Sequence, residues 1–173
     1  MTKKKVFIKN SGLIIRPVSE ADVDAILEVY RQSEDFLALG PEPEASKEMV
    51  VHDLLQSRAV GGIFCGIYYQ DEKLIGVVDF IPEGYKGNKA AAYLELLMLA
   101  KPYRSLGLGG VIVRLVEAEI TKIPSVGRIY SHVQVNNPKA LAFWQRLGYR
   151  TSGAAVKRPD GTLVLPMIKT LRG

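Results

Sequence analysis

The chain has 173 residues, enough for one domain with a buried core and too few to expect two. Hydrophobic residues make up 47% and charged residues 24%, the ordinary globular range, and no run reaches the roughly 20 apolar residues that cross a bilayer. The net charge of +5 fits a nucleic acid or a phosphate-rich ligand, but outside Lys3–Lys5 the basic residues are scattered, so nucleic acid is the weaker interpretation.

The first half of the chain predicts one strand, two helices and then two strands. Leu13–Ile15 is the first strand and ends near Pro17. Ser19 is the expected N-cap of the first helix, with Asp22 three residues on as part of a capping box. The elements expected next are a loop over 36–41, a helix over 44–57, and strands over 63–69 and 73–80 joined by a turn at 70–72.

Strands and helices alternate in the second half. We expect a strand over 91–99, a helix over 109–122, a strand over 129–135, a helix over 137–147, and closing strands over 149–156 and 163–169. The strand–helix–strand order implies parallel pairing, whereas the hairpins on either side imply antiparallel partners. The predicted fold class is therefore α/β, with a mixed, mostly antiparallel central sheet and helices on both faces, in a single domain over residues 1–173.

The single cysteine, Cys65, lies in the apolar run 62–67. One cysteine cannot form a disulfide within the chain, no metal-binding motif is present, and no histidine or asparagine lies near Cys65 in the sequence. A small buried core residue is the favoured interpretation. Because no apolar signal segment follows Lys3–Lys5, we expect a reducing, cytoplasmic location.

A glycine-rich segment joins the strand over 91–99 to the next helix. It comprises Arg104, Ser105, Leu106, Gly107, Leu108, Gly109 and Gly110. Glycines let successive backbone N–H groups turn toward one ligand, and a helix start adds unpaired N–H groups and a positive dipole end. The segment therefore predicts a pyrophosphate site, with Arg104 adding charge. A glycine-rich turn without a ligand is the alternative.

The spacing of this segment distinguishes three kinds of phosphate loop. Its glycines do not have the spacing of a dinucleotide fingerprint, and it does not end in the Gly-Lys-Ser or Gly-Lys-Thr of a nucleoside triphosphate loop. The pattern Arg-x-x-Gly-x-Gly, from Arg104 to Gly109, instead resembles the coenzyme A loop of the GNAT superfamily of N-acetyltransferases.

A second block of residues, in the order found in that family, strengthens the resemblance: Asn137, Ala140, Phe143-Trp144 and Gly148-Tyr149. In physical terms Asn137 caps a helix, Pro138 takes its first position and Gly148 ends it. The resemblance is close over 90–149 and loose over the rest of the domain.

The resemblance implies acetyl-CoA as acyl donor and a primary amine as acceptor. It also implies that the strands beginning near Ala91 and Arg128 splay apart and that pantetheine enters the gap between them. The matching positions for contact with the cofactor, besides the glycine-rich segment, are Leu97, Met98, Leu99, Asn137 and Trp144.

Glu95 is the candidate general base. It interrupts an apolar strand, where a carboxylate is costly unless it is paired or lies in a cleft with a raised pKa. The family often has an acid at this position, whereas a structural glutamate paired with an arginine is the alternative. The resemblance makes the backbone N–H of Leu97 the candidate oxyanion donor.

Trp144 departs from the family pattern, because many members have a tyrosine there that protonates the leaving thiolate. An indole N–H is not a useful acid at neutral pH, so Tyr149 or water would have to substitute. His132 lies on the opposite side of its strand from Ile129 and Val133. We expect it to be a surface or hydrogen-bonded histidine rather than a second base.

The family builds its acceptor pocket largely from the first two helices and the loop between them. That region carries Glu34, Asp35, Glu42, Glu44 and Glu48, which form either an acidic rim for a cationic amine or a solvated helix edge. A small-molecule amine and a peptide amine both remain open as acceptors. The alternative function is a non-catalytic acyl-CoA-binding module. A homodimer is allowed, and neither nucleic acid nor a membrane is expected as a partner.

Overall fold

The computed structural model describes residues 6–171, so Lys3–Lys5 lie outside the described residues. The strands are β1 Ile8–Asn10, β2 Leu13–Pro17, β3 Ile63–Tyr69, β4 Lys73–Ile81, β5 Ala91–Leu99, β6 Arg128–Gln134, β7 Arg150–Thr151, β8 Val156–Lys157 and β9 Leu163–Thr170. They form one sheet in the order β1-β2-β3-β4-β5-β6-β9-β7, with β8 also paired to β9. Only β5 and β6 run parallel among these pairs, which confirms the mixed, mostly antiparallel sheet.

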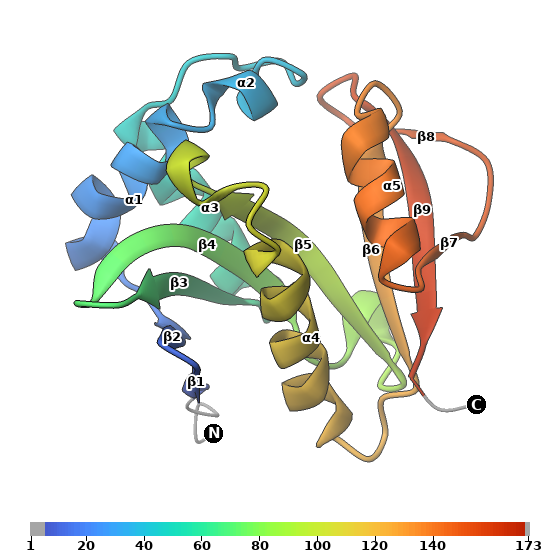
Figure 1. Ribbon diagram of the computed structural model, residues 1–173. Coiled ribbons are helices and arrows are strands. Elements are labelled where there is room, and N and C mark those ends of the chain that lie inside the picture. Colours follow the sequence, from blue (N-terminus) through green and yellow to red (C-terminus); the bar gives the residue numbers. More distant parts are fainter. Residues whose placement is uncertain (1–5, 172–173) are drawn as a thin grey trace.

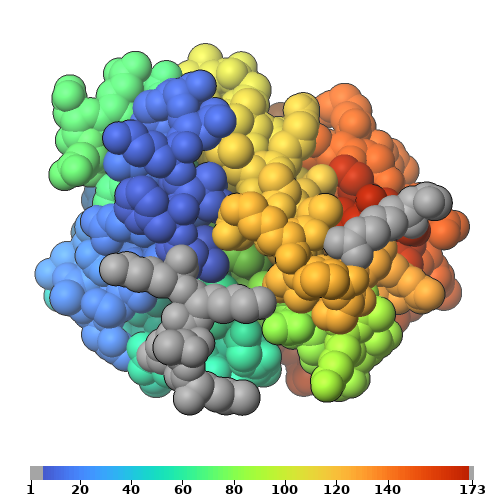
Figure 2. Space-filling view, turned by 90° about the horizontal axis from the view of Figure 1, so that it is seen from below, coloured from blue at the N-terminus to red at the C-terminus, as the bar shows by residue number. Residues whose placement is uncertain are grey.

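Helices cover both faces of this sheet, as predicted (Figure 1). The helices are α1 Val23–Arg31, α2 Glu34–Leu37, α3 Lys47–Ala59, α4 Leu108–Thr121 and α5 Pro138–Arg146. Ile112 and Val116 of α4 pack on one face in a core that includes Leu94 of β5. Ile26 of α1 and Val50 of α3 pack on the other face. Seen from below, the N-terminal strands and the last strand lie on opposite sides of α4 (Figure 2).

The central strands β5 and β6 separate after a short parallel ladder. Their pairing runs only from Ala91 with Arg128 to Leu94 with Ser131, and the Ser131 hydroxyl donates to the Leu94 carbonyl at 2.9 Å at this last pair. The β4–β5 register shifts at Glu95, which makes a β-bulge there. A bulge bends and twists its strand, so β5 turns away from β6 where their pairing ends (Figure 1). The expected splay is confirmed.

Local signals placed several boundaries correctly. Ser19 and Asp22 form the complete capping box around a short 3-10 helix, Glu20–Asp22, that leads into α1. The Asn137 side chain accepts from the N–H of Ala140 at 3.1 Å, and Pro138 is the first residue of α5. Cys65 is fully buried in the core, and burial raises the pKa of its thiol to about 12.

Two expectations were wrong, and one strand was missed. The loop over 36–41 begins inside α2, and the edge strand β1 was not foreseen. The single strand over 149–156 is two short strands, β7 and β8, which pair with different parts of β9. Pro166 of β9 lies between these pairings, and since it has no N–H it cannot extend a continuous ladder.

Candidate active site

The backbone of Leu97 faces the gap between β5 and β6. Beyond the bulge, the N–H of Ala100 donates to the carbonyl of Ile75 at 2.8 Å. Hydrogen-bonded pairs alternate along an antiparallel ladder, so the next bonded pair is Met98 with Val77. Leu97 lies between bonded pairs, and both its N–H and its C=O point away from β4, toward the gap.

The two neighbours of Leu97 are less available to a ligand. Met98 uses its backbone in the β4 ladder and buries its side chain in the core beneath α1 and α3, so it does not face the gap. The carbonyl of Leu99 already accepts from Nε of Arg104 at 2.9 Å and from the Ser33 hydroxyl at 3.4 Å. Of the three predicted backbone contacts, Leu97 therefore offers both its groups and Leu99 only its N–H.

The predicted phosphate cradle begins directly after β5 and its short 3-10 turn. Ser105 and Gly107 have left-handed backbones, with φ of 61° and 79°. The N–H of Val111 donates to the carbonyl of Gly107 at 3.4 Å, the first hydrogen bond of α4. The N–H groups before Val111 therefore have no carbonyl within the helix to bind. A Cβ on Gly107 would meet nothing within 4 Å, so glycine is needed there for its conformation. These free N–H groups and the helix dipole suit an anionic ligand.

Gly109 brings this cradle against the gap. A Cβ at Gly109 would lie 3.2 Å from a ring carbon of Phe143 on α5 and 3.9 Å from a methyl group of Leu97. The start of α4 is therefore packed beside the exposed edge of β5, and a side chain at Gly109 would push them apart. The residues expected to hold pyrophosphate and pantetheine lie next to one another.

Arg104 has a different position from the one its predicted role suggests. Its guanidinium donates to the carbonyls of Leu99 at 2.9 Å and Gln32 at 3.1 Å, and to the carboxylate of Asp35 at 2.6 Å. That hydrogen bond and charge hold the pKa of Asp35 below its usual range. Arg104 thus ties the cradle to the α1–α2 corner, and the backbone N–H groups are what the loop presents to a ligand.

Trp144 lies in the core, 8% exposed, edge-to-face with Phe143 and Tyr149. The hydroxyl of Tyr149 donates to Glu117 at 3.1 Å, and Lys169 donates to the same carboxylate at 2.7 Å. Burial and the charge of Glu117 raise the pKa of Tyr149 above its ordinary value. Tyr149 is therefore committed to a buried ion-pair cluster, which makes it unsuited to the role of general acid.

Glu95, at the bulge of β5, has a side chain that is 44% exposed. Its carboxylate lies 3.9 Å from Nη1 of Arg158, in the turn between β8 and β9. This contact matches in part the alternative of a structural glutamate paired with an arginine. The carboxylate nevertheless remains open to solvent, so a proton acceptor beside the gap is available.

A hydrogen-bonded pair that the sequence interpretation set aside lies close to Glu95. The hydroxyl of Tyr93 is 2.7 Å from Nδ1 of His132 and accepts from Arg158 at 3.0 Å. Burial, together with the positive charges of Arg158 and Lys86, lowers the pKa of His132 to about 4. The ring is neutral at pH 7, and Nδ1 is the ring nitrogen that shares a hydrogen bond with Tyr93. His132 is thus hydrogen-bonded, as expected, but inside the site.

A second carboxylate, Asp79 on β4, lies opposite Leu96 beside the bulge. It is 6% exposed and accepts from the Ser57 hydroxyl of α3 at 2.6 Å. Burial raises the pKa of Asp79 to about 6, and the charge of Glu95 adds to the effect against the Ser57 hydrogen bond. No sequence pattern pointed to this pair, because Ser57 and Asp79 come from separate elements.

The acidic rim is partly committed to structural contacts. Glu34 accepts from the N–H of Ala45 at 3.1 Å, and Asp35 binds Arg104. A groove of about 240 Å³ lies beyond them, between the loop after α2 and the turn that carries Arg158. It is lined by Leu39, Gly40, Pro41, Asp160, Gly161 and Thr162. Asp160 of this lining lies in the same turn as Arg158, whose guanidinium is 3.9 Å from Glu95.

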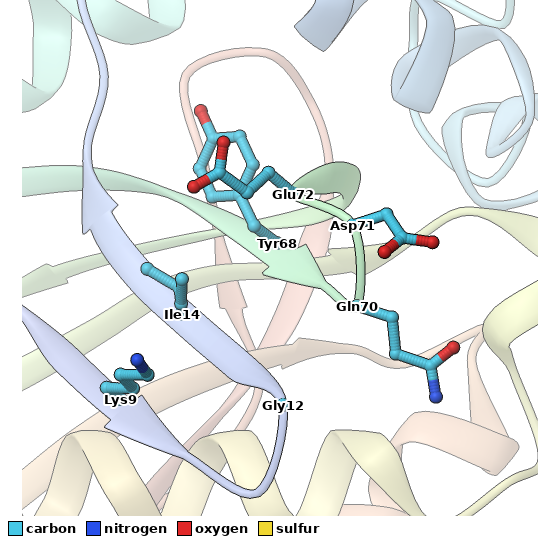
Figure 3. A pocket seen from close by; sticks show the side chains of 7 residues that line it. All are labelled: Lys9, Gly12, Ile14, Tyr68, Gln70, Asp71 and Glu72. Atoms are coloured by element: carbon cyan, nitrogen blue, oxygen red, sulfur yellow. The ribbon is translucent and has the colours of Figure 1, made fainter.

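Another hollow, of about 190 Å³, lies on the β1–β4 side of the sheet (Figure 3). Its lining comes from two hairpins and consists of Lys9, Gly12, Ile14, Tyr68, Gln70, Asp71 and Glu72. It adjoins neither the cradle nor the gap. We assign it no chemistry.

The comparisons with known proteins agree with this geometry. The chain is 34% identical over 142 residues to N-alpha-acetyltransferase 50 of Danio rerio, covering 82% of this chain and 66% of that protein. An acetyltransferase structure from Thermus thermophilus matches with a TM-score of 0.75 at 25% identity, over 95% of this chain and 100% of that one. Spermidine N-acetyltransferase from Vibrio cholerae, in complex with CoA and spermine, matches with a TM-score of 0.71 at 20% identity, over 93% and 96%.

The chain spans between about half and two thirds of the length of the curated relatives it matches. No helix within residues 6–171 is long and apolar enough to cross a membrane. A family model described as acetyltransferase (GNAT) family matches residues 24–149, which include the cradle, the gap and Glu95. The chain therefore belongs to the GNAT acetyltransferase family.

Proposed function

We propose that this chain transfers the acetyl group of acetyl-CoA directly to a primary amine. The observation that carries the proposal is the gap between β5 and β6, where the free peptide edge of Leu97 meets the start of α4 and Glu95 lies on the same strand. The relatives named as N-acetyltransferases support it.

The cofactor fits the residues present. The N–H groups from Ser105 to Gly110 would hold its pyrophosphate, and the C=O of Leu97 with the N–H of Leu99 would hold pantetheine. Asn137 would border it from the start of α5, whereas the predicted contact Trp144 packs in the core behind that surface. When bound, acetyl-CoA supplies an acetyl group activated as a thioester and a thiolate leaving group.

The residues of the chain would divide the work as follows. Glu95 accepts a proton from the amine, a role that contributes roughly 10²–10⁴-fold in rate. Tyr93 and His132 form a hydrogen-bonded wall beside it and orient the acceptor. The N–H of Leu97 donates to the oxygen on which negative charge develops, a contribution of about 2.7–4 kcal/mol.

We assign protonation of the leaving thiolate to solvent. Trp144 has no acidic proton to give, and the Tyr149 hydroxyl is bound to Glu117. Acetyl transfer then depends on the base and the backbone donor, without a protein acid.

The proposal is tested by incubating the protein with acetyl-CoA and a panel of amines that includes a peptide α-amine, spermidine and lysine. Free thiol and acetylated amine are measured together. We expect equal amounts of both with at least one acceptor. Acetyl-CoA binding without turnover on any amine would instead support the non-catalytic acyl-CoA-binding module.

The named relatives leave two classes of acceptor, a protein N-terminus and a polyamine. A cytoplasmic location stays a prediction from the sequence, which allows a homodimer without predicting one.

A further inference from the structure

The turn between β8 and β9 places a fixed positive charge beside the proposed base. Arg158 donates from its backbone N–H to the carbonyl of Thr162 at 2.8 Å, and its own carbonyl accepts from Gly161 at 2.9 Å. Its guanidinium donates to Tyr93 at 3.0 Å and lies 3.9 Å from Glu95. The Arg158 side chain is 37% exposed, so it is anchored but still accessible to a ligand.

An incoming ammonium must share the Glu95 carboxylate with this guanidinium. The positive charges of Arg158 and Lys86 also reach His132, where both disfavour the protonated ring. The guanidinium beside Glu95 therefore repels further positive charge on an acceptor whose ammonium binds that carboxylate.

The mouth of the groove carries an acidic residue instead of a basic one. Asp160 lines it, and its carboxylate accepts hydrogen bonds from the N–H and hydroxyl of Thr162. This acid is thus partly satisfied within its own turn. The groove, of about 240 Å³, lies between this turn and the loop after α2.

We propose that Arg158 selects the acceptor, favouring a peptide α-amine followed by an acidic or neutral residue and disfavouring polyamines. A guanidinium binds carboxylates and carbonyl oxygens through paired N–H donors, and a peptide supplies both groups whereas a polyamine supplies neither. This inference rests on the proposed acetyl transfer and names its acceptor class.

The test compares kcat/KM for two free-amine peptides that differ only in the second residue, glutamate or lysine, with spermidine as a third acceptor. We expect the wild-type protein to favour the glutamate peptide by about tenfold or more over the lysine peptide, and spermidine to be a poor acceptor. In Arg158→Gln this preference should fall to about a third of its wild-type value or less.

The ratio between peptides is the readout, because loss of the contacts with Tyr93 and Glu95 would change both rates together. Arg158→Lys keeps the charge but loses the paired donors, so its preference should lie between those of the wild-type protein and Arg158→Gln. Lys157→Gln removes the same charge from an exposed neighbour and should leave the ratio unchanged. Unfolding midpoints confirm that each variant is folded.

An unchanged peptide ratio in Arg158→Gln, or a wild-type preference for spermidine, would overturn the selection by Arg158 while leaving acetyl transfer in place. Absence of turnover with every acceptor would overturn the proposed function, and this inference with it.

Discussion

Among single residues, Glu95 combines an exposed carboxylate with a position at the bulge where β5 leaves β6. Replacement by glutamine keeps its shape but removes the proton acceptor. We expect Glu95→Gln to lower kcat/KM by about 10²–10⁴-fold, with little change in the Kd for acetyl-CoA. Steady-state rates and a calorimetric titration measure the two quantities.

The control for this change is Glu72→Gln, an exposed acid of the β3–β4 turn. It should leave both quantities unchanged. If the pH–rate profile of Glu95→Gln matches that of the wild-type protein, Glu95 is not the base, and its ion pair with Arg158 is structural.

Tyr149 has a structural role rather than a catalytic one, because its hydroxyl stabilises the fold. Tyr149→Phe removes a buried hydrogen bond to the charged Glu117, a bond worth about 1.5–3 kcal/mol. We expect the free energy of unfolding in urea to fall by that amount, and the pH dependence of kcat to stay the same. Tyr69→Phe is the control, with little effect on either. A lost basic limb in the kcat profile of Tyr149→Phe would show that this hydroxyl is the acid after all.

Residues of the candidate site could be predicted where the signal lay in neighbouring positions of the sequence, but not where it depended on contacts between distant elements. Glu95 interrupts an apolar run, and Asn137 lies before Pro138, so both were found from the sequence. Tyr93 and His132 are 39 positions apart and meet only because β5 and β6 pair in parallel at their starts. The buried Asp79–Ser57 contact likewise requires α3 to pack on β4.

Among the elements, the loop before α4 is the part whose backbone conformation matters most. Gly61 and Gly107 share φ of 79°, and a Cβ at either position would meet nothing within 4 Å, but only Gly107 lies in the cradle. Alanine at either position should destabilise the fold by about 1–2 kcal/mol, because a left-handed backbone strains a residue with a Cβ.

Only Gly107→Ala should also weaken acetyl-CoA binding, by about tenfold. Alanine would be strained in the left-handed conformation, so the free loop would adopt another one, and the binding conformation would have to be restored when the cofactor binds. Calorimetric titration of both variants makes the comparison. Equal affinities for Gly61→Ala and Gly107→Ala would mean that the loop does not contact the cofactor.

Elements with a long, regular apolar pattern were predictable, and irregular elements were not. The strand over 91–99 matches β5 because nine residues are apolar apart from one acid. The bulge at Glu95 was not predicted, since it depends on the register with β4. The strand over 149–156 failed because one long strand, β9, pairs with two short ones on either side of Pro166.

At the scale of the whole molecule, the sheet separates the cofactor side of the candidate site from its acceptor side. The cradle and α5 lie on the face that packs Ile129 and Val133 into the core. Tyr130 and His132 alternate with those residues and face the side of α1 and α3. The gap between β5 and β6 joins the two faces, so a cofactor entering from one side can meet an amine entering from the other.

The buried carboxylate of Asp79 should make stability depend on pH. Its folded pKa of about 6 lies above the ordinary 3.8, so the folded state holds this proton more tightly than the unfolded state does. Stability from this group is therefore present below about pH 4 and is lost as the pH rises to about 6 and above. The loss is on the order of 3 kcal/mol.

Asp79→Asn removes this titration, and other groups cancel when the variant is compared with the wild-type protein. We expect the variant to gain stability relative to the wild type between about pH 4 and 7, and to hold that gain at higher pH. Urea unfolding at a series of pH values measures the difference. Parallel stability curves would mean that Asp79 is not perturbed by the fold.

The central claim, that the cradle and the gap form an acetyl-CoA site, is tested most directly by thermal unfolding with acetyl-CoA, using ATP and NAD as controls. Acetyl-CoA at 100 times its Kd should stabilise the fold by about 2.7 kcal/mol. At roughly 2–4 °C per kcal/mol for a domain of this size, the midpoint should rise by about 5–11 °C with acetyl-CoA alone. An unchanged midpoint at saturating acetyl-CoA, in a folded protein, would mean that the loop from Arg104 to Gly110 is a turn without a ligand, and would contradict the account.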